Sequence, residues 1–376
     1  MATSAPLPGR VRTRWAFGLL NIVGLLAVIA ACAVLFTMYL LRLDDSDGRS
    51  APPPAPYRVL VQHGSELWSA GPTGQAQAVP LPSGMTSQQT LRLSPDGLKM
   101  LIIEPNAGGD QLLLHTAPGS APANLSLPPK SLNPGPWHIV AATWIDTHNV
   151  AVLLEGRGPS RGGVLAHYSI QGSTVVSPTW LPLGSGIGQL AALSPDAQHV
   201  ARLETKPASG AFAGQTIVRL SQISGDHPTV AFRYLGEMPP EALLWSPDGG
   251  TLAIQVPGLG LEIRKSSGRP VREVVDGAVP AAFSPRGASL AFISGSGLFW
   301  QVHVLNLHGE IDSTLVPPSN GVPTLLGWTP DARALIYGTG NSLWQIDPAS
   351  GASTRLPASV SGSLVGIVPA GAPFAR

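Results

Sequence analysis

The chain has 376 residues, of which 44% are hydrophobic and 12% are charged, and its formal net charge is +1. It has one cysteine, which excludes an intramolecular disulfide, and only scattered arginines, which argues against nucleic acid as a partner. The 43 glycines and 38 prolines punctuate short apolar runs, as expected for strands joined by tight turns.

The first expected element is a membrane-spanning helix over residues 15–41. This stretch contains no charged residue and is long enough, at about 1.5 Å per residue, to cross a bilayer. Arginines precede it and aspartates follow it, so the positive-inside rule places residues 1–14 in the cytosol. The sequence therefore predicts a single-pass cell-membrane protein with an extracytoplasmic domain.

Two alternatives stay open for this segment. A cleaved signal peptide has an apolar core of about 7–15 residues, which is shorter than this stretch. Residues 29–32 (IAAC) resemble a bacterial lipobox ending in Cys32, although apolar residues continue to Leu41. Residues 42–56 are first acidic and then proline-rich, which predicts a semi-rigid linker.

A four-residue turn motif recurs through the rest of the chain. SPDG occurs at 94–97 and 246–249, and variants occur at 194–197, 284–287 and 329–332. Proline sets φ for a turn, the serine hydroxyl can accept a backbone hydrogen bond, and glycine supplies a positive φ. The aspartates are thus expected to form turns. Alanine replaces the glycine at Ala197 and Ala332, so these two turns are expected to differ in geometry.

Each such turn joins two apolar strands into an inner hairpin that alternates with an outer hairpin. Seven outer hairpins are recognisable, but only six inner ones: 91–104, 141–154, 190–204, 243–256, 281–294 and 325–338. Residues 57–62 and 363–368, from the two ends of the domain, can pair to form the seventh. The repeats therefore predict an all-β, seven-bladed β-propeller at residues 57–368, with a C-terminal tail at 369–376; six or eight blades are the alternatives.

The order of apolar strand, SPDG turn, second strand and Leu-Trp strand resembles the repeats of TolB-type propellers, which are related in shape to WD-repeat propellers. The resemblance covers residues 57–368 and implies a periplasmic or cell-surface binding module. Some propellers of that family are attached to prolyl-oligopeptidase-type hydrolases. No such domain follows the propeller repeats in this sequence, so the resemblance transfers no catalytic residue.

These observations predict a membrane-anchored protein–protein interaction module that is not an enzyme and has no cofactor or metal. An accessory subunit of a larger membrane complex is the alternative. A ligand-binding or enzymatic propeller is the third option, but the inner strands show mostly Ala, Leu and Trp, where a channel site needs polar groups.

The predicted binding surface is the face opposite the SPDG turns. The linker enters the domain on the face with these turns, so the opposite face points away from the membrane. Loops on a rigid scaffold concentrate binding residues. Trp137, Arg157 and Arg161 lie in long loops on that opposite face and are the predicted contacts for the protein partner.

Overall fold

The computed structural model describes residues 55–375 except for 83–85, 133–134, 158–161, 186–189, 206–215, 224–227, 235–239, 258–259, 275–277, 297–298, 308–310, 316–322 and 360. The predicted membrane helix at 15–41 and most of the linker lie outside this part. Within it, no helix has the length and apolar character needed to cross a membrane. The chain divides into residues 1–53 and 54–376, and the second unit is described below.

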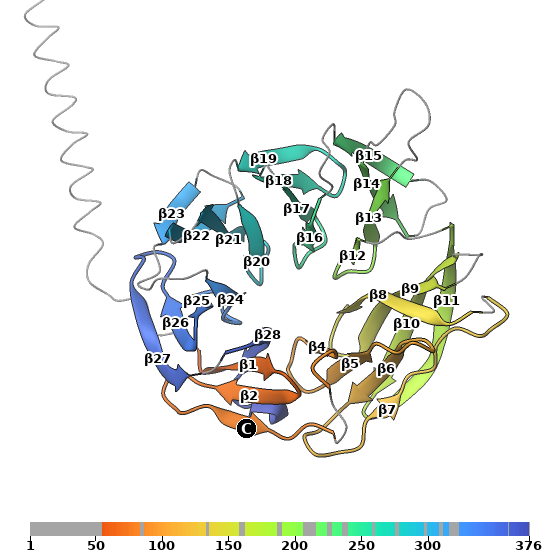
Figure 1. The fold of residues 1–376 in the computed structure, drawn as a ribbon, viewed down its shortest axis with the longest axis horizontal. Coiled ribbons are helices and arrows are strands. Elements are labelled where there is room, and N and C mark those ends of the chain that lie inside the picture. The colour runs from red at the N-terminus through yellow and green to blue at the C-terminus, as the bar shows by residue number, and fades with distance from the viewer. Residues whose placement is uncertain are drawn as a thin grey trace, which may run out of the picture. The chain divides into compact units, whose positions relative to one another are not determined.

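The second unit consists of seven four-stranded antiparallel sheets, or blades (Figure 1). From innermost to outermost strand, blades 1 to 3 are β28 (Ser363–Pro369), β1 (Tyr57–His63), β2 (Glu66–Ala70) and β3 (Gln77–Val79); β4 (Thr90–Leu93), β5 (Met100–Glu104), β6 (Gln111–His115) and β7 (Ala123–Asn124); and β8 (Trp137–Trp144), β9 (Asn149–Gly156), β10 (Gly162–Gln171) and β11 (Thr174–Ser185).

Blades 4 to 7 follow in the same order: β12 (Ala191–Leu193), β13 (His199–Thr205), β14 (Thr216–Gln222) and β15 (Pro228–Tyr234); β16 (Ala242–Trp245), β17 (Thr251–Val256), β18 (Gly260–Lys265) and β19 (Pro270–Val274); β20 (Val279–Phe283), β21 (Ser289–Ser296), β22 (Phe299–Asn306) and β23 (Ile311–Leu315); and β24 (Thr324–Trp328), β25 (Leu335–Thr339), β26 (Ser342–Ile346) and β27 (Ser353–Ser359).

The inner strands close a ring. β28 contacts β4, and contacts continue through β8, β12, β16, β20 and β24 back to β28. Blade 1 combines the two ends of the domain, because β28 pairs antiparallel with β1. The predictions of seven blades and of a blade shared by both ends are therefore confirmed.

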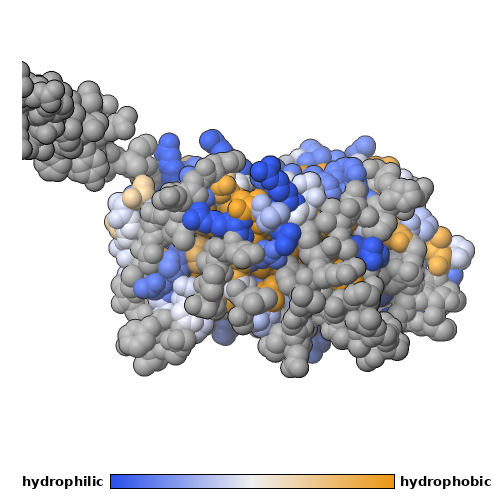
Figure 2. Space-filling model, turned by 90° about the horizontal axis from the view of Figure 1, so that it is seen from above, coloured by the Kyte–Doolittle hydropathy of each residue, from blue (hydrophilic) through white to orange (hydrophobic). Residues whose placement is uncertain are grey.

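The core lies between adjacent blades. Strand β9 reads as a nearly continuous apolar run, and residues Val150 to Leu154 are all fully buried. A strand covered on both faces has no solvent-facing side chains, so its sequence does not alternate. Viewed edge-on, the described surface mixes hydrophilic and hydrophobic residues (Figure 2). The large apolar side chains exposed on the described part are Leu98, Leu132, Val176 and Leu181.

The five SPDG-type turns share one hydrogen-bond pattern. The N–H of the fourth residue donates to the carbonyl of the first at 2.8–2.9 Å, and the hydroxyl of the first accepts the N–H of the sixth at 2.9–3.0 Å. In the four turns that contain aspartate, its Oδ1 accepts the N–H two residues further on. The prediction that these aspartates form turns is confirmed.

The prediction that the two alanine turns differ in geometry is wrong. Ala197 and Ala332 have φ of 54° and 61°, close to the 69° of Gly97, and form the same hydrogen bonds. An alanine in this region costs roughly 1–2 kcal/mol. The hydrogen bonds of the turn hold the backbone there in spite of that cost.

At the SPDG turns, glycine also allows neighbouring blades to approach. A Cβ added to Gly249 would lie 2.6 Å from the carboxyl group of Asp196 in the preceding blade, whereas one added to Gly340 would meet nothing within 4 Å. Both have positive φ, 67° and 57°. We expect Gly340→Ala to lower the free energy of unfolding by about 1 kcal/mol and Gly249→Ala by more than about 2 kcal/mol. Urea unfolding measures both, and equal losses would contradict the close inter-blade contact.

Tryptophans at the ends of alternate inner strands connect pairs of blades. The indole N–H of Trp144, Trp245 and Trp328 donates to the backbone carbonyl of Arg92, Ala192 and Ala282, respectively, at 3.0–3.1 Å. Blades 2 and 3, 4 and 5, and 6 and 7 are thus joined by equivalent bonds. A buried indole N–H requires an acceptor, and the inner strand of the preceding blade provides it.

The end of the chain packs into the interface between blades 1 and 2. Phe374, in the 3-10 helix η1 (Pro373–Ala375), is fully buried against a cluster that includes Leu60 and Leu67. Its ring centroid lies 5.2 Å from that of His115. His115 is itself fully buried, and neither ring nitrogen has a hydrogen-bond partner among the described residues.

His115 makes stability sensitive to acid. Burial lowers the pKa of His115 below its ordinary value of 6.5, because the charged form is desolvated. As pH falls below 6.5 the unfolded chain binds a proton that the folded chain excludes, so stability is lost in that direction. We expect a loss of up to about 1.4 kcal/mol per pH unit from this group. Urea unfolding at pH 7.5 and 5.5 measures how much the free energy of unfolding falls between these two pH values. The fall should be smaller for His115→Leu than for the unmodified chain, and an equal fall would contradict a contribution from His115.

Candidate functional site

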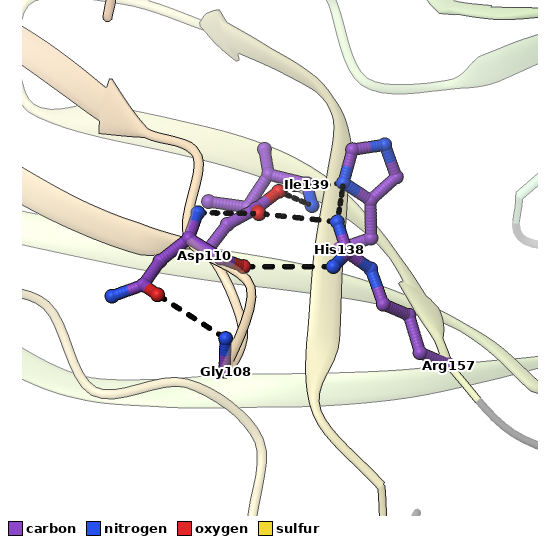
Figure 3. A network of polar contacts seen from close by, with 6 residues as sticks. Gly108, Asp110, His138, Ile139 and Arg157 are labelled. Carbon is purple, nitrogen blue, oxygen red and sulfur yellow. Dashed lines mark hydrogen bonds and ion pairs between the residues drawn. The ribbon is translucent and has the colours of Figure 1, made fainter.

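A polar cluster joins blades 2 and 3 on the face opposite the SPDG turns (Figure 3). We call the face opposite the SPDG turns the loop face. It comprises the starts of the inner strands and the loops between second and third strands. Asp110 immediately precedes β6, His138 is the second residue of β8, and Arg157 follows β9. In antiparallel blades these positions fall at the same end of the sheet, so residues distant in sequence meet there.

The carboxylate of Asp110 is the buried centre of the cluster, with 1% of its side chain exposed. Its Oδ2 accepts the backbone N–H of Ile139 at 2.8 Å and lies 2.6 Å from Nδ1 of His138. Its Oδ1 lies 3.6 Å from Nη2 of Arg157. A buried carboxylate is tolerated only with such partners, so the burial of Asp110 depends on both neighbouring side chains.

The hydrogen bond to Asp110 determines what His138 can do. A neutral imidazole that donates from Nδ1 to a carboxylate leaves Nε2 unprotonated and able to accept a proton. The His138 side chain is 45% exposed, and its second nitrogen points away from the network (Figure 3). The geometry therefore provides an oriented base that is accessible from solvent.

Arg157 places a positive charge beside that base. Its backbone N–H donates to the carbonyl of Pro136 at 2.8 Å, and its Nη2 lies 3.4 Å from Nδ1 of His138. The side chain is 44% exposed, so the guanidinium can also bind an anion from solvent. The cluster thus combines an oriented base with an anion-binding group.

The structure separates the three residues predicted from sequence. Arg157 belongs to the cluster. Trp137 is 5% exposed and donates its indole N–H to the carbonyl of Pro128 at 3.0 Å, so it packs the start of β8 and presents no surface to a partner. Arg161 lies outside the described residues.

Sequence reasoning missed Asp110 and His138. They lie 28 residues apart, in different blades, and form no local motif. An alignment of the repeats was needed to pair them. It would have to show that the residue before the third strand of one blade lies beside the start of the inner strand of the next blade. Among the described residues no group of three or more His, Cys, Asp or Glu could hold a metal ion.

Comparison with known proteins shows similarity at the level of fold. Neither a protein-family model nor a curated protein matches the sequence. A candidate 6-phosphogluconolactonase of Bacteroides uniformis aligns over 83% of this chain and 99% of its own, with TM-score 0.54 and 12% identity. The periplasmic gluconolactonase PpgL of Pseudomonas aeruginosa aligns over 83% and 98%, with TM-score 0.54 and 13% identity. The dihydro-heme d1 dehydrogenase NirN aligns over 84% and 69%, with TM-score 0.52 and 16% identity.

These comparisons overturn the prediction of a non-enzymatic protein-interaction module. That prediction rested on the resemblance to TolB-type repeats, which implies a binding module, whereas the similar solved structures are named as lactonases and a dehydrogenase. It also relied on the mostly apolar inner strands, which offer few polar groups to a channel site; the structure instead brings Asp110, His138 and Arg157 together between blades 2 and 3. At 12–16% identity the likeness itself shows the fold alone.

Proposed function

We propose that this propeller hydrolyses a small anionic lactone or ester at the Asp110–His138–Arg157 cluster. The observation that supports this most directly is the buried Asp110 carboxylate, which holds Nδ1 of His138 near the Arg157 guanidinium and leaves Nε2 free. An imidazole held in this way is suited to remove a proton from water. The names of the similar structures support the choice of sugar lactones as the first substrates to test.

In the proposed reaction, Nε2 of His138 takes a proton from a water molecule whose oxygen attacks the lactone carbonyl carbon. The imidazolium that forms is stabilised by the Asp110 carboxylate. Arg157 stabilises the negative charge that develops on the carbonyl oxygen. The ring C–O bond then breaks, the proton passes from His138 to the departing oxygen, and lactone and water together become one hydroxy acid.

The test is the rate of hydrolysis of glucono-δ-lactone and its 6-phosphate by the full-length chain, with the spontaneous rate subtracted. His138→Gln is expected to lower the rate by about 100-fold or more, because general-base catalysis contributes 10²–10⁴-fold. His148→Gln, an exposed histidine in the turn before β9 on the opposite face, is the matched control and should keep the full rate. An unchanged rate in His138→Gln, or no hydrolysis above the spontaneous rate, would refute the proposal.

We further propose that residues 15–41 anchor the propeller outside the cytosol, in keeping with the resemblance of its turn sequences to TolB-type repeats. The uncharged stretch supports this, as does the position of the linker end, where the N–H of Ala55 donates to Asp331 of an SPDG-type turn at 2.8 Å. Carbonate extraction should leave the full-length chain in the membrane pellet and release a chain lacking residues 1–41. Release of both would refute the anchor.

A further inference from the structure

Arg92 is the one formally charged residue in the seven inner strands that the structure describes. The strands read TLRL, WHIVAATW, AAL, ALLW, VPAAF, TLLGW and SLVGIVP, without an aspartate or glutamate. A ring wall of this composition carries a local positive potential with no acidic group on the wall to neutralise it. A small anion entering from solvent is therefore favoured over a cation.

The contacts of Arg92 leave most of its donors available. Within the described part of the chain the one hydrogen bond of its guanidinium is a long one, 3.4 Å from Nη1 to the carbonyl of Leu91, and the guanidinium has no carboxylate partner. The side chain is exposed to solvent, yet the surrounding protein desolvates it enough to lower its pKa. The Arg92 guanidinium is thus accessible to a ligand and also partly enclosed by protein. An ion pair in such surroundings is stronger than one on an open surface.

A cavity adjoins this charge on the loop face, between blades 1 and 2. Its volume is about 350 Å³, within the range of small-molecule sites. Besides Arg92 its lining includes the neutral polar residues Gln62, Ser87, Gln88, Gln89, Thr90 and Ser363, together with Gly64 and the apolar Leu91, Leu364 and Val365. The neutral polar side chains offer donors and acceptors suited to hydroxyl groups.

Two glutamines of this cavity differ in their hydrogen bonds. Nε2 of Gln62 donates to the carbonyls of Gly64 and Gln89, at 3.2 and 3.1 Å, which fixes its amide at the cavity wall. Oε1 of Gln89 is buried without a hydrogen-bond partner among the described residues. An unpaired buried acceptor is costly, so an amide turned towards a bound hydroxyl gains a bond that the empty cavity lacks.

We propose that this cavity is a second site, which binds the carboxylate of a small polyhydroxylated acid through Arg92 and its hydroxyl groups through the glutamines and serine. The site belongs to the interface of blades 1 and 2, whereas the Asp110 cluster joins blades 2 and 3. It therefore does not depend on the hydrolase proposed above.

The test is titration calorimetry of the full-length chain with sodium gluconate, with glucose as the uncharged probe and inorganic phosphate as the anion without hydroxylated carbons. Gluconate is expected to bind more tightly than either. Arg92→Gln should weaken gluconate binding about 10-fold or more, since hydrogen bonds to charged groups are the strong ones. Arg92→Lys, which keeps the charge, guards against a variant that fails to fold and should retain part of the affinity.

Arg286→Gln is the matched control, because it removes an exposed arginine of an SPDG-type turn on the opposite face, outside both sites. Unchanged gluconate affinity in this variant, together with the loss in Arg92→Gln, supports the second site. Loss in Arg157→Gln with full affinity in Arg92→Gln would overturn it, as would equal binding of phosphate and gluconate, or no binding of gluconate. The lactone-hydrolysis assay of His138→Gln is a separate measurement, so the failure of one proposal is distinguishable from the failure of the other.

Discussion

A chain ending at residue 360 should lose cooperative unfolding altogether. Strand β28 supplies the inner strand of blade 1, and its pairing with β1 closes the ring. Without it the inner edge of β1 has no hydrogen-bond partner, and the fully buried Val59, Leu60 and Val61 lose their cover. The truncation also removes Phe374 from its core cluster, a loss of about 3–5 kcal/mol by itself. Thermal unfolding followed by circular dichroism measures the result.

A permuted chain provides the matched control. β28 and β1 are the inner and second strands of blade 1, as β4 and β5 are in blade 2. In blade 2 these two strands are connected by the turn at residues 94–99. Fusing residues 363–369 to Tyr57 through a copy of residues 94–99 should restore a cooperative transition to the truncated chain. A truncated chain that unfolds cooperatively without this addition would show that the ring does not require closure.

Asp110→Asn is expected to lower the proposed hydrolysis rate by about 10²–10⁴-fold. The amide can still accept the N–H of Ile139, but it offers no negative charge to a protonated His138. It can also reverse the tautomer of His138, since an amide N–H₂ beside Nδ1 donates where the carboxylate accepted. The rate as a function of pH, measured on the full-length chain, separates the loss of the base from a simple loss of binding.

Two further variants distinguish chemistry from folding. Asp110→Leu leaves the buried N–H of Ile139 without an acceptor, so we expect a loss of about 1–3 kcal/mol in the free energy of unfolding. Asp196→Asn alters a turn aspartate on the opposite face and should leave the rate unchanged. A full rate in Asp110→Asn would remove Asp110 from the proposed mechanism.

The turn motif was the strongest predictor because its bonds are local. Each SPDG-type turn is stabilised by hydrogen bonds within six residues, so the sequence of the turn suffices to predict it. The number of blades and the closure by 57–62 and 363–368 followed from counting these turns. The geometry at Ala332 could not be predicted in this way. Alanine by itself disfavours a positive φ, but the hydrogen bonds of the turn impose one.

The sequence by itself determined the all-β repeat architecture, the pairing of the two ends and the face on which Arg157 lies, since these depend on local turn chemistry and on alternation of hairpins. Tertiary structure alone decided that Trp137 is buried and that Asp110 meets His138 across 28 residues. It also decided that Arg92 lies beside a cavity lined by Gln62 from another blade. These contacts arise from the way neighbouring blades pack, and packing between blades leaves no pattern in a local stretch of sequence.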